Sequence, residues 1–315
     1  MSGPMFRTLD DVVYGRAEPV FGTIRRVIAD NPSKFTYRGT GTYLIGDADV
    51  VVIDPGPALD THRDALAAAL HGCRVTAILI THCHADHSPL AGWLAAETGA
   101  PTFGFGPHPR PDPMLVPPPD DGDETVIEET VIEESVDHDF VPDHAVSHGE
   151  VLDLAPGVTV EAVHTPGHTS NHTCWAMAMD GVRTLFSGDH VMGWSTTVVS
   201  PPDGDMTAYL DSLRLGVDRA DDVVVPTHGP PRDDVVEYVG ALIEHRLARE
   251  RAVLDAVRAG RVAVPEIVAD LYADVRPELH KPAGRSVWAH LVRLVETGRV
   301  AVEGPATLDA VYRAV

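Results

Sequence analysis

The chain has 315 residues, of which 44% are apolar, enough for one large domain with a small appendage or for two domains. It has 24 basic and 47 acidic side chains, which gives a formal charge of −23. An acidic body disfavours binding to a phosphate backbone because like charges repel. Nucleic acid is therefore the less favoured class of partner, and it stays an alternative.

Cysteine usage and the first residues bear on the compartment. Cys73, Cys83 and Cys174 are odd in number and widely spaced, so we expect no disulfide framework and a cytoplasmic location. The first residues lack a basic stretch followed by an apolar one, which predicts no signal peptide. No apolar run approaches the ~20 residues that a membrane span needs, so no membrane partner is expected.

Alternating β-branched runs and turn residues predict an α/β arrangement in the first hundred residues. A short apolar strand leads into a histidine-rich loop, and a helix follows that loop. Strand, loop and helix in this order are typical of an active site at a sheet edge. In chain order, the expected elements are a hairpin at residues 42–45 and 50–53, a helix capped by Asp60 that runs to Leu70, a strand at residues 75–80 and a helix from Ser88 to Glu97.

Residues 106–150 are expected to form an acidic insertion. The stretch is rich in proline and glycine at its start and then in acidic side chains, and it contains a tandem repeat, residues 125–129 followed by residues 130–134. Such composition favours an exposed loop. Two interpretations stay open: a lid over the site, or a solvated insertion without a direct role.

The C-terminal quarter is predicted to form a separate winged-helix-like domain, at residues 240–315, after a catalytic domain at residues 1–239. The tail carries 11 basic and 10 acidic side chains, which is not the basic patch of a DNA-binding module. We therefore expect a packing role or a homodimer contact, with a contribution to the substrate wall as a further alternative. The later expected elements are strands at residues 158–163 and 182–187, helices at 206–215, 235–259, 265–272 and 286–297, and a β-wing at 299–303.

The strongest chemical signal follows the predicted strand at residues 75–80. There the sequence reads Thr81-His82-Cys83-His84-Ala85-Asp86-His87. Imidazole and carboxylate groups are ligands that zinc accepts. An irregular loop after a strand can bring them together, and three histidines with an aspartate at this spacing are hard to explain as core packing.

Three later motifs each place a histidine or an aspartate beside glycine, where a strand is predicted to end. Glycine permits the backbone to approach a metal closely. Each motif alone is a weak signal, but their order and intervals form a strong joint one. The motifs are Thr165-Pro166-Gly167-His168-Thr169, Ser187-Gly188-Asp189-His190 and Pro226-Thr227-His228-Gly229-Pro230.

Together these motifs resemble the metallo-β-lactamase superfamily over roughly residues 20–235. The resemblance implies a four-layer αββα sandwich, and the tail makes the lactamase-beta-2-like branch the most similar. It also implies that Asp54 orients the ligand loop from behind the metals. Carried over by position, one metal would be held by His82, His84 and His168, the other by Asp86, His87 and His228, with Asp189 bridging both.

The resemblance implies a hydrolase with two zinc ions per chain; iron and manganese are alternatives because His/Asp sites bind several metals. A hydroxide shared by both ions would attack a small acyl substrate, a thioester, ester or lactone, and Asp86 would help to orient or deprotonate water. The alternatives are a metal-dependent endoribonuclease on single-stranded RNA, a mononuclear iron enzyme like the persulfide dioxygenases, and a non-catalytic binding protein. True β-lactam cleavage is not implied.

Some neighbours of the ligands are weaker candidates. His190 and Trp194 are considered for contact with substrate in the cleft, beside the alternative that they only support the fold. Residues 192–199, followed by 201–205, are interpreted either as a wall of the metal cleft that sets substrate choice or as scaffold. His172 is expected to be structural. Cys83, between two ligands, is expected to point into the protein and to be neither a ligand nor a nucleophile.

Overall fold

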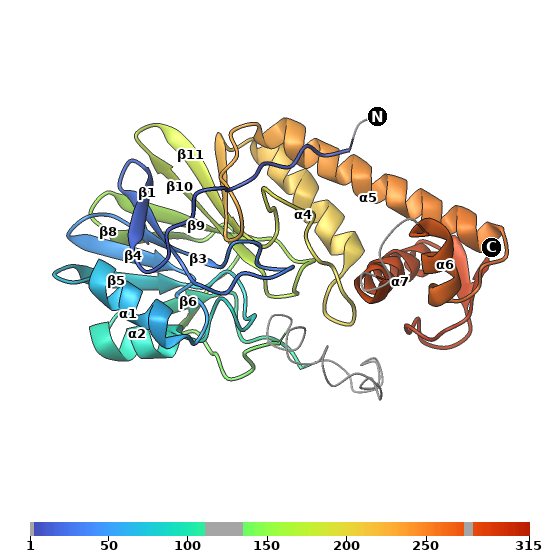
Figure 1. Ribbon diagram of the computed structural model, residues 1–315, viewed down its shortest axis with the longest axis horizontal. Coiled ribbons are helices and arrows are strands. Elements are labelled where there is room, and N and C mark those ends of the chain that lie inside the picture. Colours follow the sequence, from blue (N-terminus) through green and yellow to red (C-terminus); the bar gives the residue numbers. More distant parts are fainter. Residues whose placement is uncertain (1–2, 111–134, 274–279) are drawn as a thin grey trace.

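The protein is described here by a computed structural model, which covers residues 3–110, 135–273 and 280–315. Two β-sheets pack face to face, and a smaller helical domain lies at one end (Figure 1). The larger sheet has its strands in sequence order: β1 (Ala17–Phe21), β2 (Ile24–Ile28), β3 (Gly41–Ile45), β4 (Asp49–Ile53), β5 (Arg74–Leu79), β6 (Thr102–Gly104) and β7 (His144–Ala145).

The second sheet has five strands and is antiparallel except for the β11–β12 pair. In the first sheet, β4 to β7 are parallel neighbours. Parallel strands end at the same sheet edge, so the loops after them gather in one crevice. In spatial order the second sheet is β12 (Val223–Pro226), β11 (Val182–Gly188), β10 (Thr173–Met179), β9 (Val158–His164) and β8 (Val151–Ala155).

Period-two alternation builds the core between the sheets. On β3, Tyr43 and Ile45 point into the cluster shared by both sheets, where they meet Trp175 and Phe186, while Leu44 points to the opposite face. Because both faces of the central strands are covered, residues on either face are buried.

Helices cover both outer faces, which completes the four-layer αββα sandwich predicted from the sequence. Helices α1 (Asp60–Ala69) and α2 (Ala91–Thr98) pack through Leu66 and Leu94 against the first sheet. Helices α4 (Met206–Arg219) and α5 (Val235–Arg258) pack against the second sheet. Figure 1 shows the two helix layers on opposite sides of the sheets.

Two helix starts differ from the sequence-based expectation. Asp60 was expected to cap α1, but Leu59 occupies the N-cap position without a side-chain hydrogen bond, and Asp60 is the first helical residue. Helix α2 begins at Ala91 rather than at Ser88, because the backbone of residues 84–88 is tied into the histidine loop, where His87 N and Ser88 N both donate to the carbonyl oxygen of His84.

The C-terminal domain has the winged-helix pattern expected from the sequence. Helices α6 (Val264–Leu271) and α7 (His280–Glu296) are followed by the antiparallel pair β13 (Val300–Val302) and β14 (Tyr312–Ala314). Their core contains Val287, Trp288 and Tyr312.

Helix α5 belongs to both parts of the molecule. Its first half contributes Tyr238 and Val239 to the core beneath the second sheet, and its last turns contribute Val253 and Leu254 to the winged-helix core. The domain boundary expected at residue 240 therefore falls inside a continuous helix rather than in a linker.

The acidic insertion is described only in part. Residues 111–134, which include the tandem repeat, lie outside the described residues. After them the chain rejoins the histidine loop: Ala85 N donates to the carbonyl oxygen of Ser135 at 2.9 Å, and Asp137 N donates to that of Cys83 at 2.7 Å. Of the two interpretations of the insertion, neither is tested by these contacts, and both stay predictions.

Candidate metal centre

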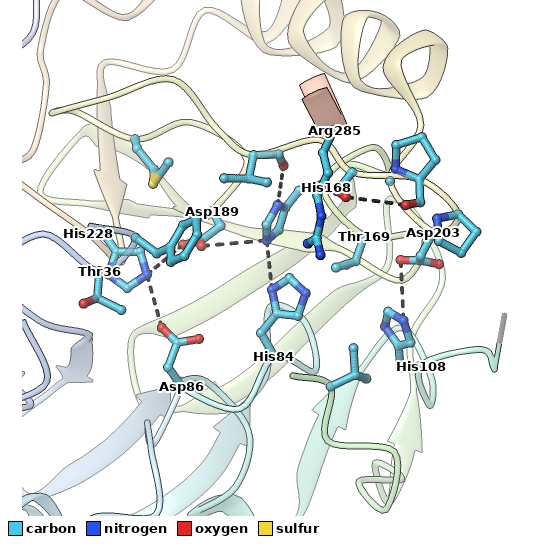
Figure 2. A pocket seen from close by; sticks show the side chains of 18 of the residues that line it. Thr36, His84, Asp86, His108, His168, Thr169, Asp189, Asp203, His228 and Arg285 are labelled. Carbon is cyan, nitrogen blue, oxygen red and sulfur yellow. Dashed lines mark hydrogen bonds and ion pairs between the residues drawn. The ribbon is translucent and has the colours of Figure 1, made fainter. Parts of the chain in front are cut away.

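Seven metal-ligand candidates from four loops converge at one edge of the two sheets. Figure 2 labels His84, Asp86, His168, Asp189 and His228 among them. The loop after β5 brings four of them, and the loops after β9, β11 and β12 bring one each. Side chains at strand ends point into the crevice between the layers, as expected for α/β folds. The converging residues are His82, His84, Asp86, His87, His168, Asp189 and His228.

A first group consists of three histidines. Nδ1 of His84 lies 2.9 Å from Nε2 of His82 and 3.0 Å from Nε2 of His168. Burial, and then the neighbouring histidines, hold the pKa of His82 and that of His84 well below the usual value. The group is thus composed of uncharged imidazoles whose ring nitrogens face one another.

A second group combines a carboxylate with two histidines. Oδ2 of Asp86 lies 3.4 Å from Nε2 of His87 and 3.3 Å from Nε2 of His228. Burial opposes ionisation of Asp86, but the adjacent histidines hold its pKa down at about 2. Burial likewise opposes charge on His87, yet the nearby carboxylates raise its pKa to about 9. This group therefore attracts positive charge.

Asp189 lies between the two groups and presents a different oxygen to each. Its Oδ2 is 3.8 Å from Nε2 of His168, and its Oδ1 is 3.4 Å from Nε2 of His228 and 3.7 Å from Nε2 of His87. A carboxylate placed in this way can hold two cations at once.

The hydrogen bonds behind the ligands determine which ring nitrogen is free to bind a metal. Nδ1 of His87 faces a carboxylate oxygen of Asp54 at 2.9 Å. Nδ1 of His168 faces the carbonyl oxygen of Val198 at 2.7 Å, and Nδ1 of His228 faces that of Gly39 at 3.3 Å. These oxygens can only accept, so each Nδ1 donates to one of them and each Nε2 faces the centre, where its lone pair would bind a metal in place of a proton.

Asp54 organises the loop from behind the second group. Its Oδ1 accepts from the backbone N of Thr81 at 2.8 Å, and its Oδ2 accepts from the Thr81 hydroxyl at 2.7 Å as well as from His87. Because the Thr81 hydroxyl proton is used in this way, its oxygen accepts from Nδ1 of His82 at 3.1 Å. Asp54 thus has the place that the sequence resemblance implied for it.

The donor set fits a bound metal. Nε2 of His87 and Oδ1 of Asp189 are buried and have no hydrogen-bond partner among the described residues, an arrangement that costs free energy unless a cation satisfies both atoms. Imidazole and carboxylate are also the ligand types that zinc and related divalent ions accept.

Gly188 lets the β11 loop bring Asp189 into the centre. Its backbone is left-handed, with φ +50°, and a Cβ there would lie 2.7 Å from Nε2 of His172 and 2.9 Å from Cβ of Thr81. No larger residue fits without displacing these neighbours. His172 has a supporting role, since its Nδ1 contacts the Thr165 hydroxyl and its Nε2 accepts from Asp189 N at 3.3 Å.

Two residues considered for the substrate cleft lie elsewhere. His190 is buried against Tyr209 and His172 and does not line the cavity beside the metal centre, because the turn after Asp189 directs its ring inward. Trp194 is stacked on Tyr37, with ring centroids 4.6 Å apart, and is likewise absent from the cavity wall. Substrate contact by either residue stays a prediction.

Cys83 points away from the ligands, as expected. It is buried, its Sγ accepts from Nδ2 of Asn171 at 3.1 Å, and burial raises its pKa to about 11. A thiol in this environment is a poor nucleophile and a poor ligand.

A cavity of about 240 Å³ opens on the metal centre. Much of its wall is apolar, and Arg285 of the winged-helix domain also lines it. The segment at residues 192–205, interpreted from the sequence as a cleft wall or as scaffold, contributes much of this wall. Sequence reasoning missed the parts that come from Phe35, His108 and Val136, because these residues are distant from the ligands in the chain. Besides the ligands His84, Asp86, His168, Asp189 and His228, the wall includes Phe35, Thr36, His108, Val136, His138, Thr169, Met192, Val198, Ser200, Pro201, Pro202, Asp203 and Gly204.

Comparison with known proteins assigns the family. The model of the metallo-beta-lactamase superfamily matches residues 37–228, and that of the beta-lactamase associated winged helix domain matches residues 263–306. The chain belongs to the metallo-beta-lactamase superfamily of hydrolases and carries the winged helix domain associated with it. The fold and the family predicted from the histidine motifs are thereby confirmed.

Two relatives show the range of similar proteins. An atrochrysone carboxyl ACP thioesterase of Aspergillus chevalieri is 30% identical over 82% of this chain and 76% of its own length. A beta-lactamase-like protein 2 homolog of Caenorhabditis elegans is 29% identical over 91% of this chain and 88% of its own.

Solved structures agree on the fold across both domains. A metallo-beta-lactamase family protein from Thermus thermophilus is 22% identical, with a TM-score of 0.70 over 94% of this chain and 100% of that one. A beta-lactamase domain protein from Burkholderia ambifaria is 21% identical, with a TM-score of 0.72 over 97% of this chain and 96% of that one.

In the described part of the chain, the helices are too short or too polar to cross a membrane.

Proposed function

We propose that this chain is a hydrolase that uses two zinc ions to cleave a small acyl substrate, with a thioester favoured over an ester or a lactone. The observation that supports it most is the position of Asp189, whose two carboxylate oxygens face two separate ligand groups beside one cavity. One ion would be held by His82, His84 and His168 and the other by Asp86, His87 and His228, with Asp189 shared.

Bound zinc supplies Lewis acidity, which lowers the pKa of water and polarises a carbonyl oxygen. The protein's own residues prepare this chemistry. Asp86 lines the cavity, and its Oδ2 accepts from the Thr40 hydroxyl at 2.8 Å. That contact fixes the carboxylate, so that Asp86 can orient a water molecule toward the substrate carbonyl.

The cavity wall suits an acyl group. Phe35, Val136, Met192 and Val198 form apolar surface next to the ligands, which would bind an acyl chain and exclude bulk water from the reacting carbonyl. A thioester is favoured because the relative from Aspergillus chevalieri is named an acyl-carrier thioesterase. A cytoplasmic location and a homodimer stay predictions.

The proposal is tested by elemental analysis of purified protein, followed by a hydrolysis panel of thioesters, lactones, β-lactams and single-stranded RNA. Two zinc ions per chain and thioester cleavage are expected, and His168→Ala should lower the zinc content below two ions per chain and abolish cleavage. His71→Ala is the matched control, because His71 is an exposed histidine distant from the centre.

Three results would replace the proposal with a different one. Metal-dependent cleavage of RNA without thioester hydrolysis would make the chain an endoribonuclease. A single iron ion with oxygen consumption would indicate a dioxygenase. A fully metallated protein that hydrolyses nothing in the panel would favour a binding role.

A further inference from the structure

Arg285, which comes from the winged-helix domain, lines the same cavity as the metal ligands. Figure 2 shows its side chain directed into the cavity, next to His168 and Thr169. The C-terminal domain therefore contributes a side chain to the wall of the candidate active site. Of the roles considered from the sequence, packing or dimerisation alone does not account for this placement, whereas a contribution to the substrate wall does.

Helix α7 holds Arg285 in this position through contacts on two faces. Val287 and Trp288 pack into the winged-helix core, while Ala289, one turn after Arg285 on the same face, packs into the core formed by α4, α5 and the second sheet. At the far end of the helix, the hydroxyl of Thr207 donates to Oε2 of Glu296 at 3.0 Å. The helix is thus docked on the catalytic domain along its length.

The charge distribution in the cavity singles out this arginine. Among the described residues that line the cavity, Arg285 is the one with a permanently cationic side chain, whereas Asp86, Asp189 and Asp203 are acidic. Asp203 is also held by Ser170, whose backbone N and hydroxyl both donate to it, and lies 3.6 Å from Nε2 of His108. An anionic group in the cavity would be repelled from the acidic positions and attracted to Arg285 and the metal centre.

Guanidinium geometry and burial then indicate what binds. The planar fork of arginine matches the two oxygens of a carboxylate. The side chain is half-buried, so its attraction to a carboxylate in the cavity is screened less than it would be in bulk water.

Cavity size decides where on the substrate the anion lies. Arg285 and the metal ligands share a space of about 240 Å³, so a charge bound by Arg285 is close to the reacting carbonyl. The phosphate of a pantetheine carrier is separated from the thioester by the whole length of its arm. We propose that Arg285 recognises a carboxylate on the acyl group of the substrate, which makes the winged-helix domain a determinant of substrate specificity. This inference rests on the proposed hydrolase function.

The test compares substrates that differ only in charge. Glutaryl and glutaramoyl thioesters of N-acetylcysteamine have nearly the same shape, but only the first carries a carboxylate. In Arg285→Gln, kcat/KM for the glutaryl thioester should fall about 10- to 100-fold, as expected for loss of a charge-assisted hydrogen-bonded pair. The value for the glutaramoyl thioester should stay within about twofold, because that substrate carries no charge for Arg285 to bind.

Two further variants serve as controls. Arg285→Lys keeps the charge and should retain part of the preference for the glutaryl over the glutaramoyl thioester. If Arg285→Gln does not fold, the same two kcat/KM values measured in Arg285→Lys still test the inference. Arg258→Gln removes an exposed cation of the same domain and should change neither substrate's kinetics. Metal content and melting temperature of all variants should match those of the wild type.

Several results would overturn the inference. An equal loss for both thioesters would mean that Arg285 supports the fold and not recognition. A second comparison uses phosphopantetheine and pantetheine thioesters of one neutral acyl group, which differ only in the phosphate. If Arg285→Gln lowers kcat/KM for the phosphopantetheine thioester alone, Arg285 binds the phosphate of the carrier arm and not the acyl group. Wild-type protein that hydrolyses the glutaramoyl but not the glutaryl thioester would refute a carboxylate site while leaving the hydrolase proposal intact. Hydrolysis of neither would overturn the carboxylate inference, and the panel of thioesters, lactones, β-lactams and RNA would then decide the hydrolase proposal separately.

Discussion

The carboxylate of Asp54 accepts a hydrogen bond from Nδ1 of His87 at 2.9 Å and so turns Nε2 of that histidine toward Asp86 and Asp189. Asp54 is itself fully buried and fixed by Thr81. The orientation of a ligand in the second group therefore depends on a residue that lies outside that group.

Asp54→Asn should weaken metal binding by the second group about 10- to 100-fold, as is typical when a partner of a ligating histidine is removed. The amide of asparagine can present an N–H to Nδ1 of His87. His87 would then no longer be held with its proton on Nδ1. Competition with a chelator measures the affinity. Asp47→Asn, at an exposed position in the β3–β4 turn, is the control, and equal affinities in both variants would contradict the assigned role.

Asp189→Ala should lower bound metal from about two ions per chain and abolish hydrolysis, since both ions would lose a ligand. Elemental analysis and the thioester assay measure the two effects. Asp211→Ala removes an exposed aspartate of α4 and should change neither. Metal content equal to that of the wild type would show that Asp189 does not bridge.

Gly188→Ala should destabilise the protein by about 1–3 kcal/mol, because it combines a left-handed backbone with steric overlap. Gly181→Ala is a well-matched control: that glycine is also left-handed, but no atom lies within 4 Å of its added Cβ. Denaturant unfolding of both variants separates crowding from backbone strain. Equal losses of unfolding free energy in the two variants would mean that His172 and Thr81 move to accommodate the added Cβ without destabilising the protein.

Acid should destabilise the protein through His290. Burial, and then the nearby arginines, lower its pKa to about 3, and neither ring nitrogen has a hydrogen-bond partner in the described part of the chain. The folded pKa is below the unfolded value of 6.5, so the neutral form is favoured in the fold. Its stabilising effect is complete above about pH 6.5 and decreases as the pH falls toward about 3.

The measurement compares the free energy of unfolding of the wild type and of His290→Leu at about pH 7.5 and about pH 5. Because a pKa difference is worth about 1.4 kcal/mol per unit, the wild type should lose about 2 kcal/mol more than the variant between these pH values. Parallel decreases in the two proteins would refute the role of His290.

The sequence predicted much of the fold because the strands before the histidine loop are short β-branched runs bounded by turns. It did not predict β10, residues Thr173–Met179. That strand is rich in alanine and methionine and is buried over most of its length on both faces, so it has neither β-branched enrichment nor alternation.

The candidate ligands were recognisable because their spacing along the chain repeats the pattern of the superfamily. Phe35 and Val136 were not recognisable as cavity wall, since they meet Arg285 there only through long-range packing. The sequence could not place the ring of His190 either, because adjacency to Asp189 does not determine where that ring points, and the loop directs it to Tyr209.

Helix α5 is continuous and contributes to two hydrophobic cores. The orientation of the winged-helix domain relative to the catalytic domain therefore depends on the number of residues in this helix. One residue inserted in its middle would rotate everything after it by about 100°, and Arg285 would swing away from the cavity. An insertion of about seven residues, roughly two whole turns, would nearly restore the direction but shift the domain along the axis by roughly 10 Å. Recombining this winged helix with another catalytic domain therefore requires conservation of the helix length, in addition to a compatible surface.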